Sequence, residues 1–211
     1  MIKVDSIRVS VFSTNCYLVR NTETKEGFLI DPGDYEEKLL DVLREKEVKL
    51  TAIYLTHGHL DHFMAAERIK AEYNVSVYCH EEELAVLADP VQNLTARFMR
   101  NGIVFKDAIG LEDGAEFTAA GVPVKLFHTP GHTPGGCCYY LPEHGILFSG
   151  DTLFFRSIGN TEFPGGSMGT LSRSIREKLY TLPEDTVVYA GHGEETDIGS
   201  EKRENPFVPN L

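Results

Sequence analysis

The chain has 211 residues, of which 42% are hydrophobic and 25% charged, with a formal net charge of −12. This length and composition are typical of a soluble globular protein, and we predict a single domain over residues 1–211. The acidic balance argues against a basic nucleic-acid-binding face, and no segment approaches the ~18 apolar residues needed to span a bilayer. We therefore expect no nucleic-acid partner and no membrane partner.

The N-terminal residues and the cysteines indicate the cellular compartment of the protein. The N-terminal residues lack a basic segment followed by an apolar run, so the sequence shows no secretion signal. The cysteines are Cys16, Cys79, Cys137 and Cys138, and they include no Cys-x-x-Cys pair. We therefore expect reduced, buried thiols in a cytoplasmic protein, with metal ligation by Cys137 or Cys138 as the alternative.

Apolar periodicity divides the first half of the chain into strands and helices. Turn-rich residues separate the first three strands, which indicates an opening β-meander. The expected elements are strands at 4–12, 15–20 and 27–30, a helix at 34–47, a strand at 50–55, a helix at 63–70, a strand at 75–79 and a helix at 81–88.

Four metal-competent side chains separate the buried strand at 50–55 from the next helix: His57, His59, Asp61 and His62. In an extended segment His57 and His59 point to the same side, whereas Asp61 and His62 diverge at the start of a helix. One short loop can thus supply ligands to two metal ions, at the strand end where α/β sheets bind ligands. The alternative is a polar loop with surface histidines.

Asp31 ends the strand at 27–30, at the same predicted end of the sheet. Its carboxylate would there orient a metal-binding histidine from outside the ligand shell. The equally plain alternative is a turn aspartate before Pro32-Gly33.

The second half of the chain begins with a less regular stretch, residues 89–113, which either covers the site as a lid or connects two halves. A short helix is expected within it at 91–100. The later elements are strands at 115–119 and 122–128, a hairpin of 137–142 and 145–149, a glycine- and proline-rich loop at 154–169, a helix at 171–181, a strand at 186–190 and a polar tail from 194.

Three later residues share the placement of the first cluster. His132, Asp151 and His192 each follow an apolar strand and lie in a glycine-containing loop, which permits tight turns. The complete set divides into two metal sites with one shared ligand. The first would use His57, His59 and His132, the second Asp61, His62 and His192, and Asp151 would bridge the two ions.

This ligand set predicts a catalytic centre, because three protein ligands and a shared carboxylate leave room for water at each ion. Two ions ~3.5–4 Å apart would lower the pKa of a bridging water toward ~7, and the resulting hydroxide would be the nucleophile. Asp61 would also orient that hydroxide, and one ion would polarise a carbonyl oxygen. Zinc is the first choice of metal, and the same ligands suit iron and manganese.

The order His-x-His-x-Asp-His at residues 57–62 resembles the metallo-β-lactamase superfamily, and segments 129–135, 149–154 and 190–193 resemble its later motifs in the same order. The resemblance implies an α/β fold, an αββα sandwich of two mixed β-sheets flanked by helices, with a dimetal site at one edge. Segments 159–167 and 195–207 are further similar to glyoxalase II-like hydrolases, in particular to short forms without the C-terminal region that helps hold glutathione.

The resemblance and the ligand set together predict a dimetal hydrolase that cleaves a thioester or a related small acyl compound, with a small molecule as substrate. The first alternative is a mononuclear iron oxygenase of the persulfide dioxygenase type, since two histidines and one aspartate suffice for that chemistry. The second alternative is a non-catalytic metal-binding module.

The loop after Asp151 supplies the candidate substrate contacts. Phe154, Phe155, Arg156 and Asn160 follow it closely, and Arg156 could meet a substrate carboxylate. The alternative for these residues is aromatic packing and a surface arginine.

Overall fold

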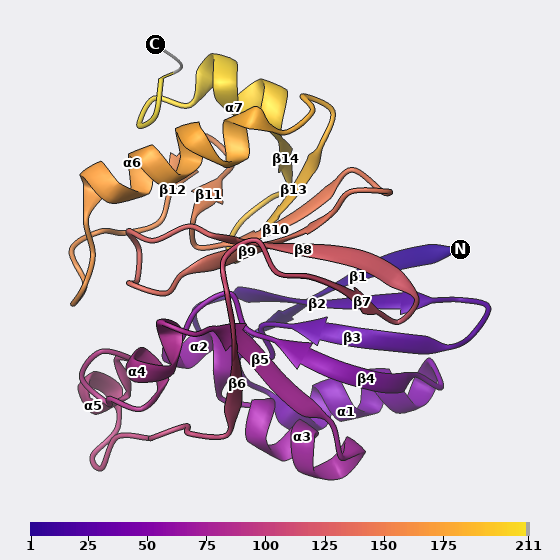
Figure 1. Cartoon of the computed structure of the whole chain (residues 1–211). Helices are drawn as coiled ribbons and strands as arrows, with labels where there is room; N and C mark the ends of the chain where they lie inside the picture. The colour runs from indigo at the N-terminus through magenta and orange to yellow at the C-terminus, as the bar shows by residue number, and fades with distance from the viewer. Residues whose placement is uncertain (210–211) are drawn as a thin grey trace.

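The elements stack in four layers, with two β-sheets face to face and helices on the outer face of each sheet (Figure 1). This structure, a computed structural model, describes residues 1–209. Each sheet contains both parallel and antiparallel pairs. The αββα sandwich of two mixed sheets that the resemblance implied is therefore confirmed.

The first sheet comes from the N-terminal half of the chain. Its strands are β1 (Ile2–Val9), β2 (Thr14–Asn21), β3 (Glu26–Ile30), β4 (Lys49–Tyr54), β5 (Ser76–His80) and β6 (Ala108–Leu111), paired in this order. The pairs β1–β2 and β2–β3 are antiparallel, which confirms the predicted meander. The pairs from β3 to β6 are parallel, so helical crossovers connect those strands.

The second sheet comes from the C-terminal half. Its strands are β7 (Glu116–Ala119), β8 (Val122–His128), β9 (Cys137–Leu141), β10 (Ile146–Gly150), β13 (Val187–Ala190) and β14 (Thr196–Asp197). They pair in the order β14-β13-β10-β9-β8-β7, and only β10–β13 is parallel among these pairs. A separate small hairpin consists of β11 (Leu153–Phe154) and β12 (Ser157–Ile158).

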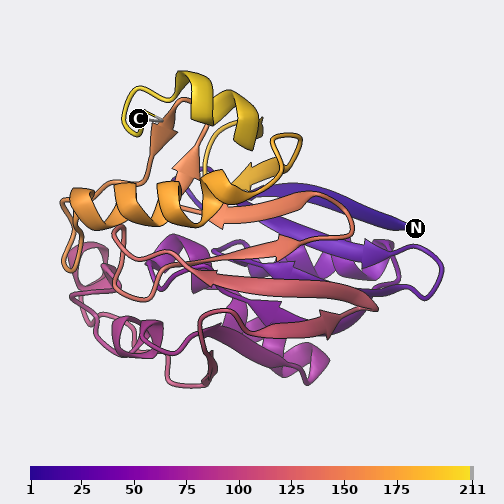
Figure 2. The same ribbon diagram turned by 45° about the horizontal axis from the view of Figure 1, so that its top comes forward.

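Helices cover the outer faces of both sheets (Figure 1 and Figure 2). The helices of the described residues are α1 (Glu36–Glu45), α2 (Leu60–Phe63), α3 (Ala66–Tyr73), α4 (Glu83–Leu87), α5 (Thr95–Phe98), α6 (Met168–Glu177), the 3-10 helix η1 (Leu179–Thr181) and α7 (Ile198–Glu204). The first sheet is covered by α1 and α3, and the second by α6 and α7. Within residues 1–209, no helix combines the length and the apolar character needed to cross a bilayer.

Alternate side chains of the central strands enter two different apolar layers, because successive residues of a strand point to opposite faces. Phe28 and Ile30 of β3 pack between the sheets with Tyr54 of β4 and Tyr139 of β9. Leu29 packs on the other face, in the layer that includes α1 and α3. Both faces of β3 are therefore buried, which explains its continuous apolar run. A third apolar cluster joins the second sheet to α6, η1 and α7.

Several segments differ from the predicted elements. The helix expected at 63–70 is divided into α2 and α3, and α2 begins within the histidine cluster. Residues 89–113 contain α5, as expected, and also the edge strand β6, which pairs with β5. The polar tail contains α7, and the loop expected from residue 154 begins inside the β11–β12 hairpin. Each unexpected element is short, so its own periodicity is weak.

All four cysteines are free and buried, which confirms the predicted thiols. The Sγ atoms of Cys137 and Cys138 lie 3.6 Å from the backbone oxygens of Leu55 and Ser149, respectively. Neither cysteine belongs to a candidate metal-binding group within the described residues. The structure therefore does not support the alternative that they ligate a metal.

Candidate metal centre

Four loops carry the seven candidate ligands to one edge of the sandwich. The loop after β4 in the first sheet and the first turn of α2 bring four of them, and the loops after β8, β10 and β13 in the second sheet bring one each. The Gly191 N–H donates to the Gly150 oxygen at 2.8 Å, which holds two of these loops side by side. A Cβ at Gly191 would lie 2.3 Å from Asp151 Oδ1, so only glycine permits this approach.

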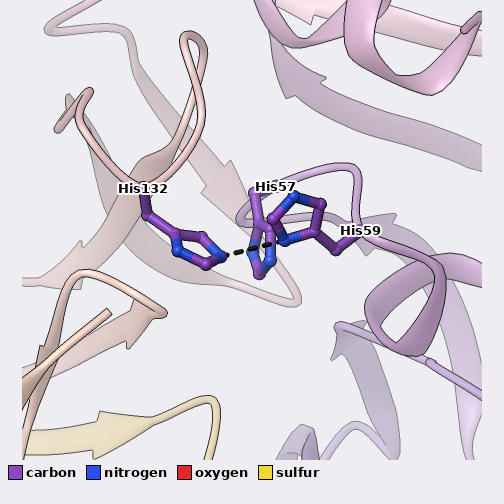
Figure 3. Close-up of side chains that lie close together, drawn as sticks. All are labelled: His57, His59 and His132. Atoms are coloured by element: carbon purple, nitrogen blue, oxygen red, sulfur yellow. Dashed lines mark hydrogen bonds between the residues drawn. The ribbon is translucent and has the colours of Figure 1, made fainter. Parts of the chain in front are cut away.

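Three buried histidines form the first candidate group: His57, His59 and His132. Their rings point toward one another, and His132 Nε2 lies 2.9 Å from His59 Nδ1 (Figure 3). Burial, together with the neighbouring imidazoles, lowers the pKa of His57 and His59 well below the usual value, and burial also lowers the pKa of His132. All three are therefore neutral near pH 7, the form in which imidazole binds a metal.

The second candidate group combines a carboxylate with two histidines. His192 Nε2 lies 3.3 Å from both Asp61 Oδ2 and His62 Nε2. Burial alone would lower the pKa of His62, but the carboxylates of Asp61, Asp151 and Asp31 outweigh it and raise the pKa to about 10. The hydrogen bond that His192 donates to Asp61 likewise raises the pKa of His192 against the effect of burial. In the absence of a cation, the carboxylates thus favour the protonated form of these rings.

Asp151 lies between the two groups. Its Oδ2 is 3.5 Å from His132 Nε2 in the first group and 3.6 Å from His192 Nε2 in the second. Its Oδ1 is 3.5 Å from His62 Nε2. One carboxylate is thus close to ring nitrogens of both groups.

The donor set fits divalent cations. His57 Nε2 and Asp151 Oδ1 are buried without a hydrogen-bond partner, and such atoms are costly unless a cation or hydrogen bond compensates them. Each group offers three ligand atoms that all lie within 4.8 Å of one another. Neutral imidazoles and carboxylates are suitable ligands for zinc, iron and manganese.

Outer hydrogen bonds fix the orientation of several candidate ligands. Asp31 accepts from the Thr56 N–H at 2.7 Å and the Thr56 hydroxyl at 2.6 Å, and its Oδ2 lies 2.9 Å from His62 Nδ1. The structure therefore favours the orienting role of Asp31 over a simple turn residue, because His62 Nε2 is left to face the centre. The backbone oxygen of Asn160 lies 2.7 Å from His132 Nδ1 and orients that ring in the same way.

Two polar residues at the start of β2 also support the centre, where the sequence indicated a turn. The Thr14 hydroxyl donates to Asp61 Oδ2 at 2.6 Å. The Asn15 side-chain amide donates to the Ala190 and Gly193 oxygens, at 3.1 Å each, on either side of His192. Serine, threonine and asparagine are ordinary turn residues, so no local signal distinguished these two.

A cavity of about 410 Å³ opens at the centre. Candidate ligands form its floor, and the wall comes largely from the loop before β2, from α5 and from Phe163. The wall residues are Phe12, Leu60, Leu94, Arg97, Phe98 and Phe163. Part of the 89–113 stretch therefore lies over the site, as one of its two alternatives expected, while β6 makes the same stretch part of the sheet.

The expected substrate contacts lie elsewhere. Phe154, Arg156 and Asn160 are absent from the residues that line this cavity. The Arg156 guanidinium pairs with Glu204 and lies 4.0 Å from Glu201, so it is already neutralised. The centre of the Phe154 ring is 6.1 Å from that of the His192 ring, and Asn160 contributes its backbone oxygen. The geometry thus favours the alternative of a surface arginine paired with acids over a contact between Arg156 and a substrate carboxylate.

Comparisons with known proteins extend the likeness beyond the motifs. A family model described as the metallo-beta-lactamase superfamily matches residues 9–192, which contain all seven candidate ligands. The chain is also similar to "Hydroxyacylglutathione hydrolase GloC" of Haemophilus influenzae, with 37% identity over 207 residues that cover 97% of each protein.

Two solved structures are similar along nearly the whole chain. The crystal structure of BLEG-1 B3 metallo-beta-lactamase has a TM-score of 0.92 and 38% identity, covering 98% of this chain and 99% of that one. The crystal structure of TTHA1623 in a di-iron-bound form has a TM-score of 0.84 and 35% identity, covering 97% and 100%.

Proposed function

Because the chain belongs to the metallo-β-lactamase superfamily, we propose that it is a hydrolase that uses two divalent ions to cleave a thioester or a related small acyl compound. The similarity to a hydroxyacylglutathione hydrolase supports the glyoxalase II-like branch. The first ion is assigned to His57, His59 and His132. The second is assigned to the Asp61, His62 and His192 group, with Asp151 reaching both.

The observation that carries this proposal is the position of Asp151. A structural metal site needs only one closed group of ligands, whereas here two open groups of three share a carboxylate. Two divalent ions held by these residues would supply an activated water at neutral pH and would polarise the substrate carbonyl. Zinc is the proposed metal, and the di-iron form of a similar structure makes iron the first alternative to test.

Asp61 is the proposed catalytic residue of the chain itself. Burial would raise its pKa, but His62 and the hydrogen bonds from His192 and Thr14 lower it well below the usual range. Asp61 is therefore ionised at neutral pH and can accept a hydrogen bond from the attacking water. The water oxygen adds to the acyl carbon, the carbon–sulfur bond breaks, and the leaving thiolate takes up the proton that the attacking water gives up.

The cavity wall supports a small acyl substrate. Phe12, Leu94, Phe98 and Phe163 offer apolar surface that excludes water from the reacting atoms. Arg97 contributes the one arginine or lysine among the lining residues, and its guanidinium carbon lies 5.9 Å from the centre of the Phe98 ring. A substrate with an apolar group and a carboxylate fits this lining.

Metal analysis combined with three activity assays tests the proposal. The protein is purified without added metal and then assayed with a panel of acyl thioesters, with a β-lactam and with a persulfide under oxygen monitoring. Two ions per chain and thioester hydrolysis are expected. One iron with oxygen uptake would instead establish the oxygenase alternative, and bound metal without any of these activities would establish the non-catalytic one. β-Lactam cleavage without thioester cleavage would overturn the thioester assignment alone.

A further inference from the structure

Glu83 is a buried acid for which the proposed reaction has no use. It begins α4, its side chain is fully buried, and it belongs to none of the candidate ligand groups. Its Oε1 accepts the Gly58 N–H at 2.7 Å. Its Oε2 accepts the Thr133 hydroxyl at 3.0 Å and the Gly135 N–H at 2.8 Å. All three partners are neutral donors, and no lysine or arginine pairs with this carboxylate among residues 1–209.

The three donors belong to the two loops that supply the three-histidine group. Gly58 lies between His57 and His59 in the loop after β4, which belongs to the first sheet. Thr133 directly follows His132 in the loop after β8, which belongs to the second sheet. The Glu83 carboxylate therefore connects the His57–His59 loop of the first sheet to the His132 loop of the second sheet by hydrogen bonds.

The backbone is shaped for this contact. A Cβ at Gly135 would lie 2.1 Å from the Glu83 backbone nitrogen, so the His132 loop reaches α4 only because residue 135 is glycine. On the far side of the same loop, His128 Nε2 lies 2.9 Å from the Pro134 oxygen. Three consecutive residues of the loop are therefore held, Thr133 and Gly135 by Glu83 and Pro134 by His128.

We propose that Glu83 is a positioning residue that sets the separation between the His57–His59 loop and the His132 loop, and thereby the affinity of the three-histidine group for its ion. The inference rests on the proposed dimetal centre. Outer residues that orient ligands typically contribute ~10–100-fold to metal affinity, and Glu83 orients both loops of one group. Burial raises the pKa of Glu83 to about 7, although the three hydrogen-bond donors act to lower it. Burying this carboxylate therefore costs free energy of folding.

The decisive variant is Glu83→Gln. A glutamine has nearly the same shape, but its amide NH₂ must face either the Gly58 N–H or the Gly135 N–H, so one buried donor loses its acceptor. We expect one of the two ions to bind ~10–100-fold more weakly and the other to change by less than about threefold. Competition between the metal-free protein and a chromophoric chelator, titrated with zinc, measures both affinities without any activity assay.

Glu81→Gln is the matched control, because this nearby side chain is exposed and, among residues 1–209, makes no hydrogen bond or ion pair with either histidine loop. It should bind both ions as the unmodified protein does. Combining Glu83→Gln with His132→Ala should add little to the effect of His132→Ala alone, because both act on the same ion. Adding His192→Ala to Glu83→Gln should instead weaken the second ion as well.

A purely structural role gives a different result: Glu83→Gln would lower the melting temperature of the metal-free protein and leave the two zinc affinities unchanged. That outcome, or equal weakening of both ions, overturns the inference. If Glu83→Gln does not fold, Thr133→Val removes only one of the three hydrogen bonds and should still weaken the same ion selectively. If the unmodified protein binds fewer than two ions, the proposed centre itself fails, which is a distinct result.

Discussion

The two ligand groups lie in one centre but differ in charge and in exposure. The three-histidine group is buried and carries no charge near pH 7, with burial lowering the pKa of each ring. The Asp61–His62–His192 group is charged, and its His192 side chain is 28% exposed. An ion entering the first group would displace no protons near pH 7, whereas an ion entering the second would have to displace the proton of His62. Two sites with the same number of ligands can therefore respond differently to pH.

Removing the Asp151 carboxylate should prevent both groups from binding an ion, so the difference in pH response between them should disappear. Asp151→Ala is expected to lower the content of both ions and to reduce turnover by roughly a thousandfold or more, because charge compensation and the shared ligand are lost together. Metal analysis and thioester hydrolysis measure the effect, with the exposed Asp185→Ala as control. Full activity with unchanged metal content in Asp151→Ala would refute the shared role.

Removing one histidine from each group should separate the two ions. His132→Ala is expected to release the ion of the neutral group, and His192→Ala that of the charged group, so each variant retains about one ion per chain. Elemental analysis after dialysis gives the stoichiometry. If either variant loses both ions together, the two groups do not bind independently.

In the metal-free protein, the difference in charge between the two groups should lead to opposite effects of pH on the free energy of unfolding. The folded pKa of His62 is raised to about 10, so its stabilising proton is fully present below its unfolded pKa near 6.5 and is lost as pH rises toward 10. The pKa of His57 and that of His59 are lowered, so these rings favour the folded state above about 6.5, and that contribution is lost as pH falls.

Denaturant unfolding of the metal-free protein should therefore show lower stability at pH 9.5 than at pH 7, by on the order of a few kcal/mol. His62→Gln is the matched variant, because it removes the titrating group, and it should flatten the alkaline side of the profile. An alkaline loss of stability that is unchanged in His62→Gln would contradict the assignment to this ring.

The smallest expected effect concerns a single outer contact of the charged group. Thr14→Val removes the hydroxyl that donates to Asp61 Oδ2 at 2.6 Å, and it should lower kcat about tenfold while the three-histidine ion is retained. The exposed Thr118→Val serves as control. Loss of the three-histidine ion in Thr14→Val would show that the groups are coupled through the start of β2.

Local patterns predicted much of the fold. The β-meander and the strands β4, β5, β8 and β9 follow from apolar runs whose periodicity is visible within a few residues. The edge strand β6 escaped prediction because two of its four residues are exposed and its partner β5 alone stabilises it. Helix α7 escaped because it is short and mostly polar, and its packing on the second sheet involves Ile198.

Within the site, the spacing from His57 to His62 and the glycine loops around His132, Asp151 and His192 were enough to predict which side chains gather at the centre. What depends on contacts between distant residues was invisible in the sequence. Glu83 resembles any acid at the start of a helix, yet its donors lie 25, 50 and 52 residues away. Arg156 resembles a free surface cation, yet Glu204 neutralises it from 48 residues away.

Residue chemistry and short-range spacing are local properties of the chain, and they were enough to predict the candidate ligands, their proposed grouping and the family. The direction in which each histidine pKa shifts, and the contacts that hold each loop in place, became visible only in the folded chain. The physical reason is that pKa and orientation depend on burial and on neighbours brought from both sheets, and these exist only once the two halves of the sandwich have packed together.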